Sequence, residues 1–172
     1  MSLIKKISSN FNIYFATVLG IGFIPFAPGT LATLFTAVIW YLIPDYIFYN
    51  KTEQLIYYNE YLYLLLILIV LYIIGIFSTT KAEKLMREDD PKIVFDELVG
   101  YLFAVLFLPK TLMITIYAFI LFRAFDIGKP FPINKSQKLK AGLGIMTDDV
   151  LAGIFSNALL QLLIIIYPNF FK

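Results

Sequence analysis

The feature that most constrains this chain is a set of long stretches without a single charged side chain. They cover residues 11–43, 61–80 and 150–171. A helix needs about 20 consecutive apolar residues to cross the hydrocarbon core of a bilayer, and each stretch reaches about that length. Of the 172 residues, 60% are hydrophobic and only 15% are charged, whereas soluble domains carry about 25% charged residues. The sequence therefore predicts an all-α, polytopic membrane protein with a single domain over residues 1–172.

The first stretch is too long for one straight span, because as a helix it would extend about 50 Å against a bilayer core of about 30 Å. Five helix-breaking residues interrupt it: Gly20, Gly22, Pro25, Pro28 and Gly29. Irregular backbone at membrane depth is tolerated only where it is buried in protein or lines a wet cavity. We therefore expect a short interfacial or re-entrant helix over residues 11–24 and the first full span over residues 31–48.

Two shorter apolar stretches, residues 98–109 and 111–122, meet at Pro109 and Lys110. Each would be about 18 Å long as a helix, which is too short to cross a membrane alone. They form either one kinked span or a helical hairpin that returns to its starting side.

The distribution of basic residues favours the hairpin. Lys and Arg mark the cytoplasmic side of membrane proteins. They are concentrated in the segments at residues 81–97 and 123–149, whereas the loop at residues 45–60 carries only Lys51. If both basic segments are cytoplasmic, the chain between them must enter the membrane and come back.

The composition also limits the chemistry, because the chain contains neither cysteine nor histidine. Zinc sites built on thiolates or imidazoles, disulfides, cysteine nucleophiles and histidine acid–base pairs are excluded. The net charge of +2 gives no basic excess of the kind that binds nucleic acid. Carboxylates, hydroxyls, Lys, Arg, Tyr and backbone groups remain.

Five carboxylates lie at the ends of apolar segments: Asp96, Glu97, Asp126, Asp148 and Asp149. In the hairpin topology all five reach the same membrane face, where they provide the hard oxygen ligands that Mg²⁺ prefers. The alternative is structural, because acids are favoured in the first turn of a helix. The pairs at 96–97 and 148–149 would then be helix starts, with Thr147 or Asp148 as the N-cap.

Asp126 fits that structural alternative poorly. It follows an apolar helix and lies near the C-terminal end, where the helix dipole disfavours an anion. It therefore needs a partner, which is Arg123, Lys129 or a metal ion. Arg123 and Lys129 themselves have two interpretations. They either cap helix carbonyls and extend to the membrane surface, or they hold a phosphate through charge-assisted hydrogen bonds.

Two glycine-containing segments are further candidates for phosphate binding. Gly144 comes shortly before an expected helix start, and exposed amides at such a terminus accept phosphate; a plain turn is the alternative. Gly29 and Thr30 belong either to a connection between two helices or to a loop that supplies a hydroxyl and amides to a phosphate. The acidic run at residues 88–90 is interpreted as a solvated loop.

Four sequence motifs together resemble the phosphatidylglycerophosphatase A family. They are Gly20-x-Gly22-x-x-Pro25-Phe-Ala-Pro28-Gly29-Thr30, then DPKIVFDELVG at residues 90–100, FRAFDIGKPFPI at residues 122–133, and GLGIMTDD followed by VLAG at residues 142–153. Ala32 and Ala141 stand where the family typically has glycine, which questions the local backbone shape more than the activity.

This resemblance implies a Mg²⁺-dependent phosphatase of the bacterial inner membrane, with its active site facing the cytoplasm, that converts phosphatidylglycerol phosphate to phosphatidylglycerol. The family's acidic positions fall on the five carboxylates, its basic positions on Arg123 and Lys129, and its N-terminal loop on Pro28, Gly29 and Thr30. Our hypothesis is that Glu97, Asp126, Asp148 and Asp149 hold one or two Mg²⁺ that activate water, and that Arg123 and Lys129 neutralise developing charge.

Asp96 is either a further ligand or the general base, and a covalent aspartyl-phosphate is a less favoured variant. The expected partner is a phospholipid in the bilayer. A membrane protein that binds or transports lipid without catalysis is the alternative function, and the sequence leaves the oligomeric state open.

Overall fold

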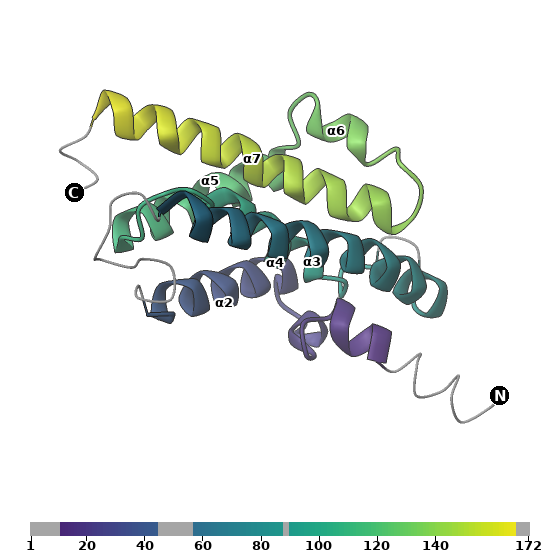
Figure 1. Cartoon of the computed structure of the whole chain (residues 1–172). Coiled ribbons are helices and arrows are strands. Elements are labelled where there is room, and N and C mark those ends of the chain that lie inside the picture. The colour runs from purple at the N-terminus through teal and green to yellow at the C-terminus, as the bar shows by residue number, and fades with distance from the viewer. Residues whose placement is uncertain (1–10, 45–56, 88–89, 168–172) are drawn as a thin grey trace.

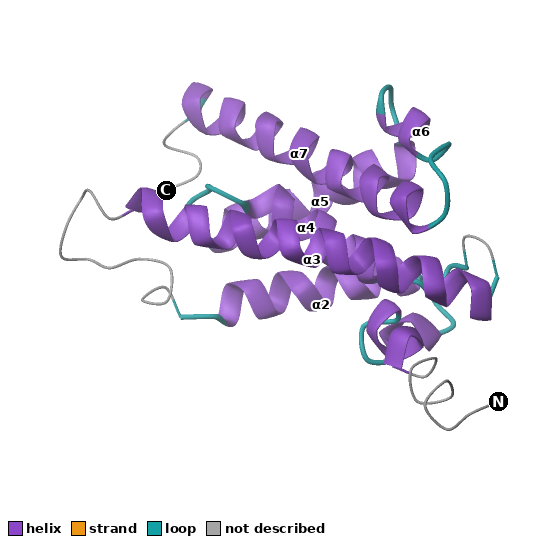
Figure 2. Ribbon diagram, turned by 45° about the vertical axis from the view of Figure 1, so that its right-hand side comes forward, coloured by secondary structure: helices purple, strands orange, loops and turns teal. Residues whose placement is uncertain are grey.

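The computed structural model describes residues 11–44, 57–87 and 90–167, and every regular element in these ranges is a helix (Figure 1, Figure 2). Residues 11–16 are helical. The later elements are η1 (Ile21–Phe23), α2 (Pro28–Leu42), α3 (Tyr57–Leu85), α4 (Phe95–Val105), α5 (Leu112–Gly128), α6 (Ile133–Ser136) and α7 (Gly142–Ile166). The all-α prediction is confirmed.

The short helix α4 occupies the centre of the bundle and contacts α2, α3, α5 and α7. Its side chains are apolar on nearly every face, as expected for a helix surrounded by others; Val99, Tyr101, Ala104 and Val105 are all at most 1% exposed. The contact with α7 is the most extensive in the fold, and small residues line it on both helices, including Gly100 and Gly153.

Helix α4 ends inside the bundle, and one buried side chain makes this possible. The side-chain amide of Asn157, on α7, donates hydrogen bonds to the carbonyl oxygens of Ala104 (3.1 Å) and Leu106 (2.6 Å). The last carbonyls of a helix have no partner within it, and leaving them unpaired in apolar surroundings would be unfavourable. Asn157 therefore permits a helix that enters the bundle only part-way.

The chain turns back after α4, so α4 and α5 form the predicted hairpin. The start of α4 and the end of α5 lie together, since Arg123 Nη1 is 4.0 Å from Glu97 Oε1. Its arms differ from the predicted stretches: α4 ends at Val105, and α5 continues past residue 122 to Gly128.

The predicted limits of two spans are wrong. The first was expected over residues 31–48, but α2 begins at Pro28 and ends at Leu42; proline at the first helical position is favourable, and Pro44 follows the helix. Residues 45–48 lie outside the described ranges. The last helix was expected to start after an N-cap at Thr147 or Asp148, but α7 starts at Gly142 after an N-cap at Ala141. Thr147 and Asp148 therefore lie within the helix and are not its N-cap. Residues 168–171 are also outside the described ranges.

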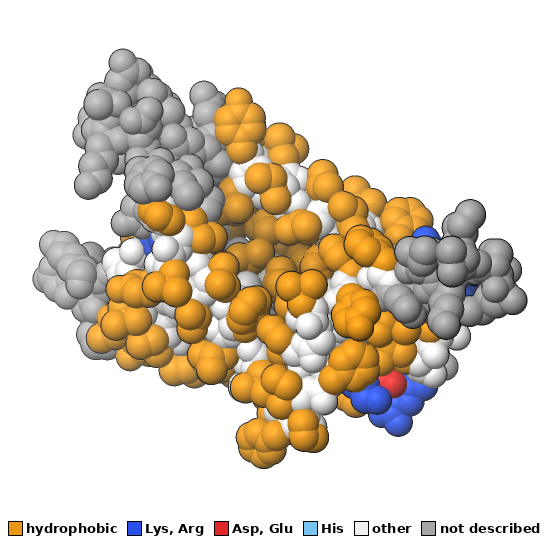
Figure 3. Space-filling model, turned by 90° about the horizontal axis from the view of Figure 1, so that it is seen from below, with side chains coloured by type: hydrophobic (Ala, Val, Ile, Leu, Met, Phe, Trp, Pro, Cys, Tyr) orange, Lys and Arg blue, Asp and Glu red, His pale blue; other side chains and the backbone are white. Residues whose placement is uncertain are grey.

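Among the described residues, two helices are long and apolar enough to cross a membrane: residues Leu62–Leu85 of α3, and α7. The shorter α2 is also apolar. The predicted break before α2 is confirmed, because residues 17–27 contain only the single turn η1. Large hydrophobic side chains cover most of the surface on the side of α2, while Lys and Arg side chains gather at one end of that face (Figure 3).

Candidate active site

A pocket of about 400 Å³ opens where four helix ends meet. Its walls come from the N-terminal ends of α2 and α4, the C-terminal end of α5 and the second turn of α7. All five predicted carboxylates and both predicted basic residues line it: Asp96, Glu97, Arg123, Asp126, Lys129, Asp148 and Asp149. We refer to it as the acidic pocket. The prediction that hairpin topology gathers these side chains at one end of the bundle is confirmed.

Three carboxylates form the closest group, which we call the carboxylate cluster. Asp96 and Glu97 come from the first turn of α4 and Asp149 from α7, and one oxygen of each lies within 4.8 Å of the other two. Asp96 is 9% exposed and Asp149 only 3%. Three anions at this distance repel one another strongly when water is excluded.

The cluster has the unsatisfied oxygens that a cation site requires. Asp96 Oδ1, Glu97 Oε2 and Asp149 Oδ2 are buried and have no hydrogen-bond partner in the protein. Burial raises the pKa of Asp96 well above its ordinary value, and burial raises the pKa of Glu97 to about 7. Buried carboxylates without partners are unfavourable, so a hard divalent cation bound by these oxygens would relieve both the repulsion and the missing bonds.

Arg123 connects two of the acids across the pocket. Its Nη1 lies 2.5 Å from Asp126 Oδ2 and 4.0 Å from Glu97 Oε1. Asp126 is in the last turn of α5, as predicted, and Arg123 is the partner that its position requires. The planar guanidinium suits this role, because its several fixed donors can bind two acceptors at once.

Lys129 ends α5 with its backbone and pairs with an acid of the pocket through its side chain. Its backbone adopts φ 40° and ψ 55° and ends α5, with its N–H donating to the carbonyl of Phe125 at 2.8 Å. Its ammonium lies 2.5 Å from Asp148 Oδ2. Burial lowers the pKa of Lys129, but the hydrogen bond and charge of Asp148 outweigh burial and leave that pKa above its ordinary value.

Gly29 and Thr30 lie on the rim of the acidic pocket, in the first turn of α2. Amides in a first turn have no acceptor within the helix, so they remain available to an anion. A side chain at Gly29 would collide with the carboxylate of Glu97 and come within 3.4 Å of Arg123 Nη1. The backbone can approach these two groups only because residue 29 has no Cβ.

Residues 14–164 match the family model for phosphatidylglycerophosphatase A. The chain belongs to the phosphatidylglycerophosphatase A family. It is therefore a phosphatase, which excludes the alternative of a membrane protein without catalysis.

Named relatives support this membership of the phosphatidylglycerophosphatase A family. Phosphatidylglycerophosphatase A of Escherichia coli is 31% identical over 144 residues, covering 82% of this chain and 76% of the relative. The Haemophilus influenzae protein of the same name is 47% identical over 70 residues, 40% of this chain and 43% of its own. A Bacteroides thetaiotaomicron protein provisionally named phosphatidylinositol-3-phosphatase is 37% identical over 156 residues, 86% and 90% of the two chains. No solved structure matches the chain.

In this phosphatase the grouping of the acids differs from the predicted metal set of Glu97, Asp126, Asp148 and Asp149. The structure groups Asp96 with Glu97 and Asp149. Asp126 and Asp148 each pair with a basic side chain, while Asp148 Oδ1 is also buried without a partner and Asp126 lies beside Asp149. Spacing along the chain does not reveal this division, because it depends on where α4, α5 and α7 face one another.

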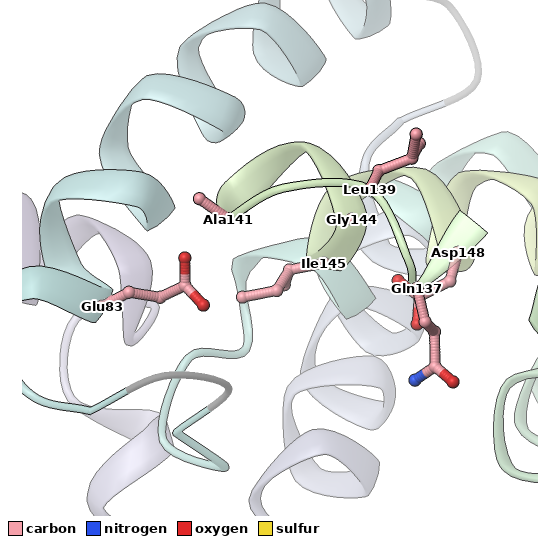
Figure 4. Close-up of a pocket in the computed structure, with 7 residues that line it drawn as sticks. All are labelled: Glu83, Gln137, Leu139, Ala141, Gly144, Ile145 and Asp148. Atoms are coloured by element: carbon pink, nitrogen blue, oxygen red, sulfur yellow. The ribbon is translucent and has the colours of Figure 1, made fainter. Parts of the chain in front are cut away.

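The structure does not bring Gly144 to the acidic pocket. Its N–H donates to the carbonyl of Ala141 at 2.8 Å, and it lines a neighbouring pocket of about 250 Å³ that shares Ile145 and Asp148 with the acidic one. In that neighbouring pocket Glu83 lies on one side and Asp148 with Gln137 on the other (Figure 4). Gly144 itself packs closely, since a Cβ there would lie 2.6 Å from the carbonyl oxygen of Leu139.

One acid of the acidic pocket was missed. Asp90 was interpreted as part of a solvated loop, but it is only 9% exposed and lines the pocket. Its Oδ1 accepts a hydrogen bond from the backbone N–H of Lys92 at 3.1 Å. The sequence signal was the following proline, because an aspartate that bonds the backbone two residues later is typical of an ordered turn. Residues 88 and 89 lie outside the described ranges.

The two departures from the family's glycines have different consequences here. Ala32 is fully buried within α2. Ala141 adopts φ 53° and ψ −147° as the N-cap of α7, a conformation that is nearly restricted to glycine. Glycine, which the resemblance implies at this position, would adopt this conformation freely, whereas alanine introduces strain just before the helix that carries Asp148 and Asp149.

Proposed function

We propose that this phosphatase hydrolyses the terminal phosphomonoester of phosphatidylglycerol phosphate to phosphatidylglycerol and inorganic phosphate. The observation that carries the proposal is the acidic pocket itself. Unpartnered buried carboxylate oxygens lie there within the same cavity as Arg123 and Lys129. A cation site beside basic groups suits a doubly charged phosphomonoester. The names of the relatives from E. coli and H. influenzae support the substrate.

We further propose that Asp96, Glu97 and Asp149 hold Mg²⁺. The donor set fits, because it consists only of carboxylate oxygens, three of which lack any other partner. Bound there, Mg²⁺ would neutralise phosphate charge and lower the pKa of a coordinated water.

The remaining residues are assigned by their contacts. Asp126 orients Arg123, and Asp148 orients Lys129, so both cations are held at the pocket beside the carboxylate cluster. From there they would bind the phosphoryl oxygens and stabilise the charge that develops on them. The free amides of Gly29 and Thr30 at the rim would hold a further phosphate oxygen.

Hydrolysis joins a water oxygen to phosphorus and breaks the bond between phosphorus and the glycerol oxygen, which takes up a proton. We favour direct attack by water over a covalent intermediate. Asp126 Oδ2 and Asp148 Oδ2 each form an ion pair with a basic side chain, and the other three acids form the proposed cation site.

We propose a multi-pass arrangement in the bacterial cytoplasmic membrane, with the acidic pocket facing the cytoplasm. Most basic side chains in the described ranges lie on the segments next to the pocket: Lys81, Lys84, Arg87, Lys92, Lys135, Lys138 and Lys140. Lys110 is at the opposite end, where its ammonium bonds the carbonyl oxygen of Ile43 after α2. This asymmetry follows the positive-inside rule.

The Bacteroides relative favours a second substrate, a phosphatidylinositol 3-phosphate. Both lipids carry a phosphomonoester on a hydroxylated headgroup, so the same acidic pocket suits either one. Phosphatidylglycerol phosphate is preferred here because the family model and two relatives carry that name.

The test measures phosphate release from both lipids and from phosphatidic acid in detergent micelles, with Mg²⁺ or with EDTA. We expect Mg²⁺-dependent release that is fastest from phosphatidylglycerol phosphate and is lost in Asp149→Asn and Asp96→Asn. Glu83→Gln, an acid outside the acidic pocket, is the matched control and should retain activity. Fastest release from phosphatidylinositol 3-phosphate would replace the proposed substrate, and full release in EDTA would refute the metal requirement.

A further inference from the structure

A groove of about 250 Å³ lies on the outside of the bundle between α2 and the first half of α5. Leu34, Val38 and Tyr41 line it from α2, and Ile116 and Phe119 line it from α5. The hydroxyl of Thr115, also in the lining, donates to the carbonyl of Thr111 on its own helix at 2.9 Å. The groove therefore offers an apolar surface to whatever fills it.

The groove begins one helical turn away from the acidic pocket. Leu34, Val38 and Tyr41 follow Thr30 at intervals of three or four residues, so they share one face of α2 with it. On α5 the lining residues Ile116 and Phe119 precede Arg123 with the same spacing. Thr30 and Arg123 both line the acidic pocket. The rows of lining residues on α2 and α5 thus lead to Thr30 and Arg123 of the acidic pocket.

The occupant of such a groove must be apolar, extended and attached to a phosphorylated headgroup. The groove is open to the surroundings, since Val38 is 48% exposed and Ile116 is 44% exposed. We propose that it holds one fatty acyl chain of the lipid substrate while the phosphate lies in the acidic pocket. This inference rests on the proposed function, because it takes the substrate to be a phospholipid.

The groove's contribution is alignment. An acyl chain leaves surroundings that are as apolar as the groove, so its transfer brings little hydrophobic gain. Fixing the chain along α2 and α5 instead restricts where the headgroup can reach, and small misplacements of a reacting group lower rates strongly. Val38 and Ile116 therefore act as positioning residues for the lipid and take no part in the chemistry.

The first test fills the groove. Val38→Trp and Ile116→Trp should lower kcat/KM for long-chain phosphatidylglycerol phosphate by about tenfold, mainly through kcat, and leave phosphate release from the deacylated analogue unchanged. Ile39→Trp and Ile120→Trp are matched controls, because both residues are similarly exposed, at 44% and 52%, and lie outside the groove lining. An equal loss on both substrates, or no loss on either, would overturn the proposal.

The second test needs no turnover. Because the chain has no cysteine, Val38→Cys and Ile39→Cys can each be labelled alone with a maleimide, in an Asp149→Asn background so that the lipid is not consumed. Phosphatidylglycerol phosphate should slow labelling at position 38 about threefold more than phosphatidylcholine does, and should not affect position 39. Equal protection by the two lipids would show an ordinary lipid-facing groove and overturn the proposal.

The two tests separate the inference from the function on which it rests. A wild-type protein that releases phosphate from no lipid refutes the proposed function. The labelling experiment then tests whether the groove holds an acyl chain, because labelling depends only on lipid binding. A wild-type protein that cleaves the long-chain lipid but not its deacylated analogue would make the first test uninformative. In that case the labelling experiment tests the groove.

Discussion

Gly153 of α7 lies directly against the backbone carbonyl oxygen of Gly100 in α4, and neither residue has room for a methyl group. A Cβ at Gly153 would overlap that oxygen, and a Cβ at Gly100 would lie 2.7 Å from the carbonyl oxygen of Asp149. This contact lets the two helices approach closely enough for Asp149 to meet Asp96 and Glu97. The carboxylate cluster therefore depends on two residues that carry no functional group.

Gly153→Ala should push the helices apart, because the added methyl group meets backbone rather than a flexible side chain. We expect a loss of about 1–3 kcal/mol in the free energy of unfolding and a larger relative loss of activity. Thermal unfolding in detergent and phosphate release measure the two effects. Gly128→Ala is the matched control, because a Cβ there meets nothing within 4 Å. A variant at position 153 with unchanged activity would contradict this role.

Ala141→Gly should stabilise the protein. Glycine adopts the observed φ of 53° without steric strain, and the relief should exceed the larger entropy that glycine loses on folding. We expect a gain of about 1 kcal/mol, seen as a higher midpoint in thermal unfolding. Ala152→Gly, in the buried middle of α7, should have the opposite effect. A lower midpoint for Ala141→Gly would show that the strain is absent.

Arg123→Lys should reduce activity about 100-fold even though it keeps the charge. A lysine ammonium is a single point donor on a flexible stem, and it cannot bind Asp126 and reach toward Glu97 in one fixed orientation. Steady-state phosphate release measures the effect, with Lys138→Ala as a control at an exposed basic residue of the same end. Activity near that of the wild-type protein would mean that only the charge at position 123 matters.

The response to Mg²⁺ should depend on pH through Glu97. Burial raises its pKa to about 7, so in the metal-free protein the folded state retains a proton there that the unfolded chain loses at lower pH. Without metal, stability should therefore fall as the pH rises toward 7. Mg²⁺ must displace this proton, so its affinity should weaken about tenfold for each pH unit below 7.

Thermal shift titrations with Mg²⁺ at about pH 6 and pH 8 test this behaviour. The stabilisation at a fixed, limiting Mg²⁺ concentration should be larger at the higher pH. Glu97→Gln removes one of the titrating ligands and should reduce the pH dependence while weakening Mg²⁺ binding overall. A wild-type response that is the same at both pH values would argue against Glu97 as a ligand.

The hairpin predicts which positions share a side of the membrane. Lys92→Cys and Lys135→Cys should react with an impermeant maleimide from the same side of sealed vesicles, since α4 and α5 lie between them and return to one end. Tyr167→Cys, just after α7 and 60% exposed, should react from the opposite side. Labelling of positions 92 and 135 from opposite sides would make residues 95–128 a single crossing.

Much of this protein was determined by local features of its sequence. Uncharged apolar runs produce helices wherever the surroundings are apolar, because unpaired backbone groups are too unfavourable there. Prolines and glycines interrupt the apolar run at residues 11–43 before α2. The apolar stretches on each side of Pro109 are each too short to span a membrane, which predicts the hairpin. The residues of the acidic pocket were likewise recognisable, because charged groups beside apolar helices stand out.

Only the tertiary structure decided how those residues are grouped. Asp96 joins Glu97 and Asp149, and Asp126 and Asp148 pair with basic residues, because the rotation and spacing of α4, α5 and α7 set which side chains meet. The burial of Asp90 and the early start of α7 are of the same kind. These features depend on contacts between segments far apart in the chain, such as the contact of Gly100 with Gly153. A local sequence pattern does not reveal such contacts.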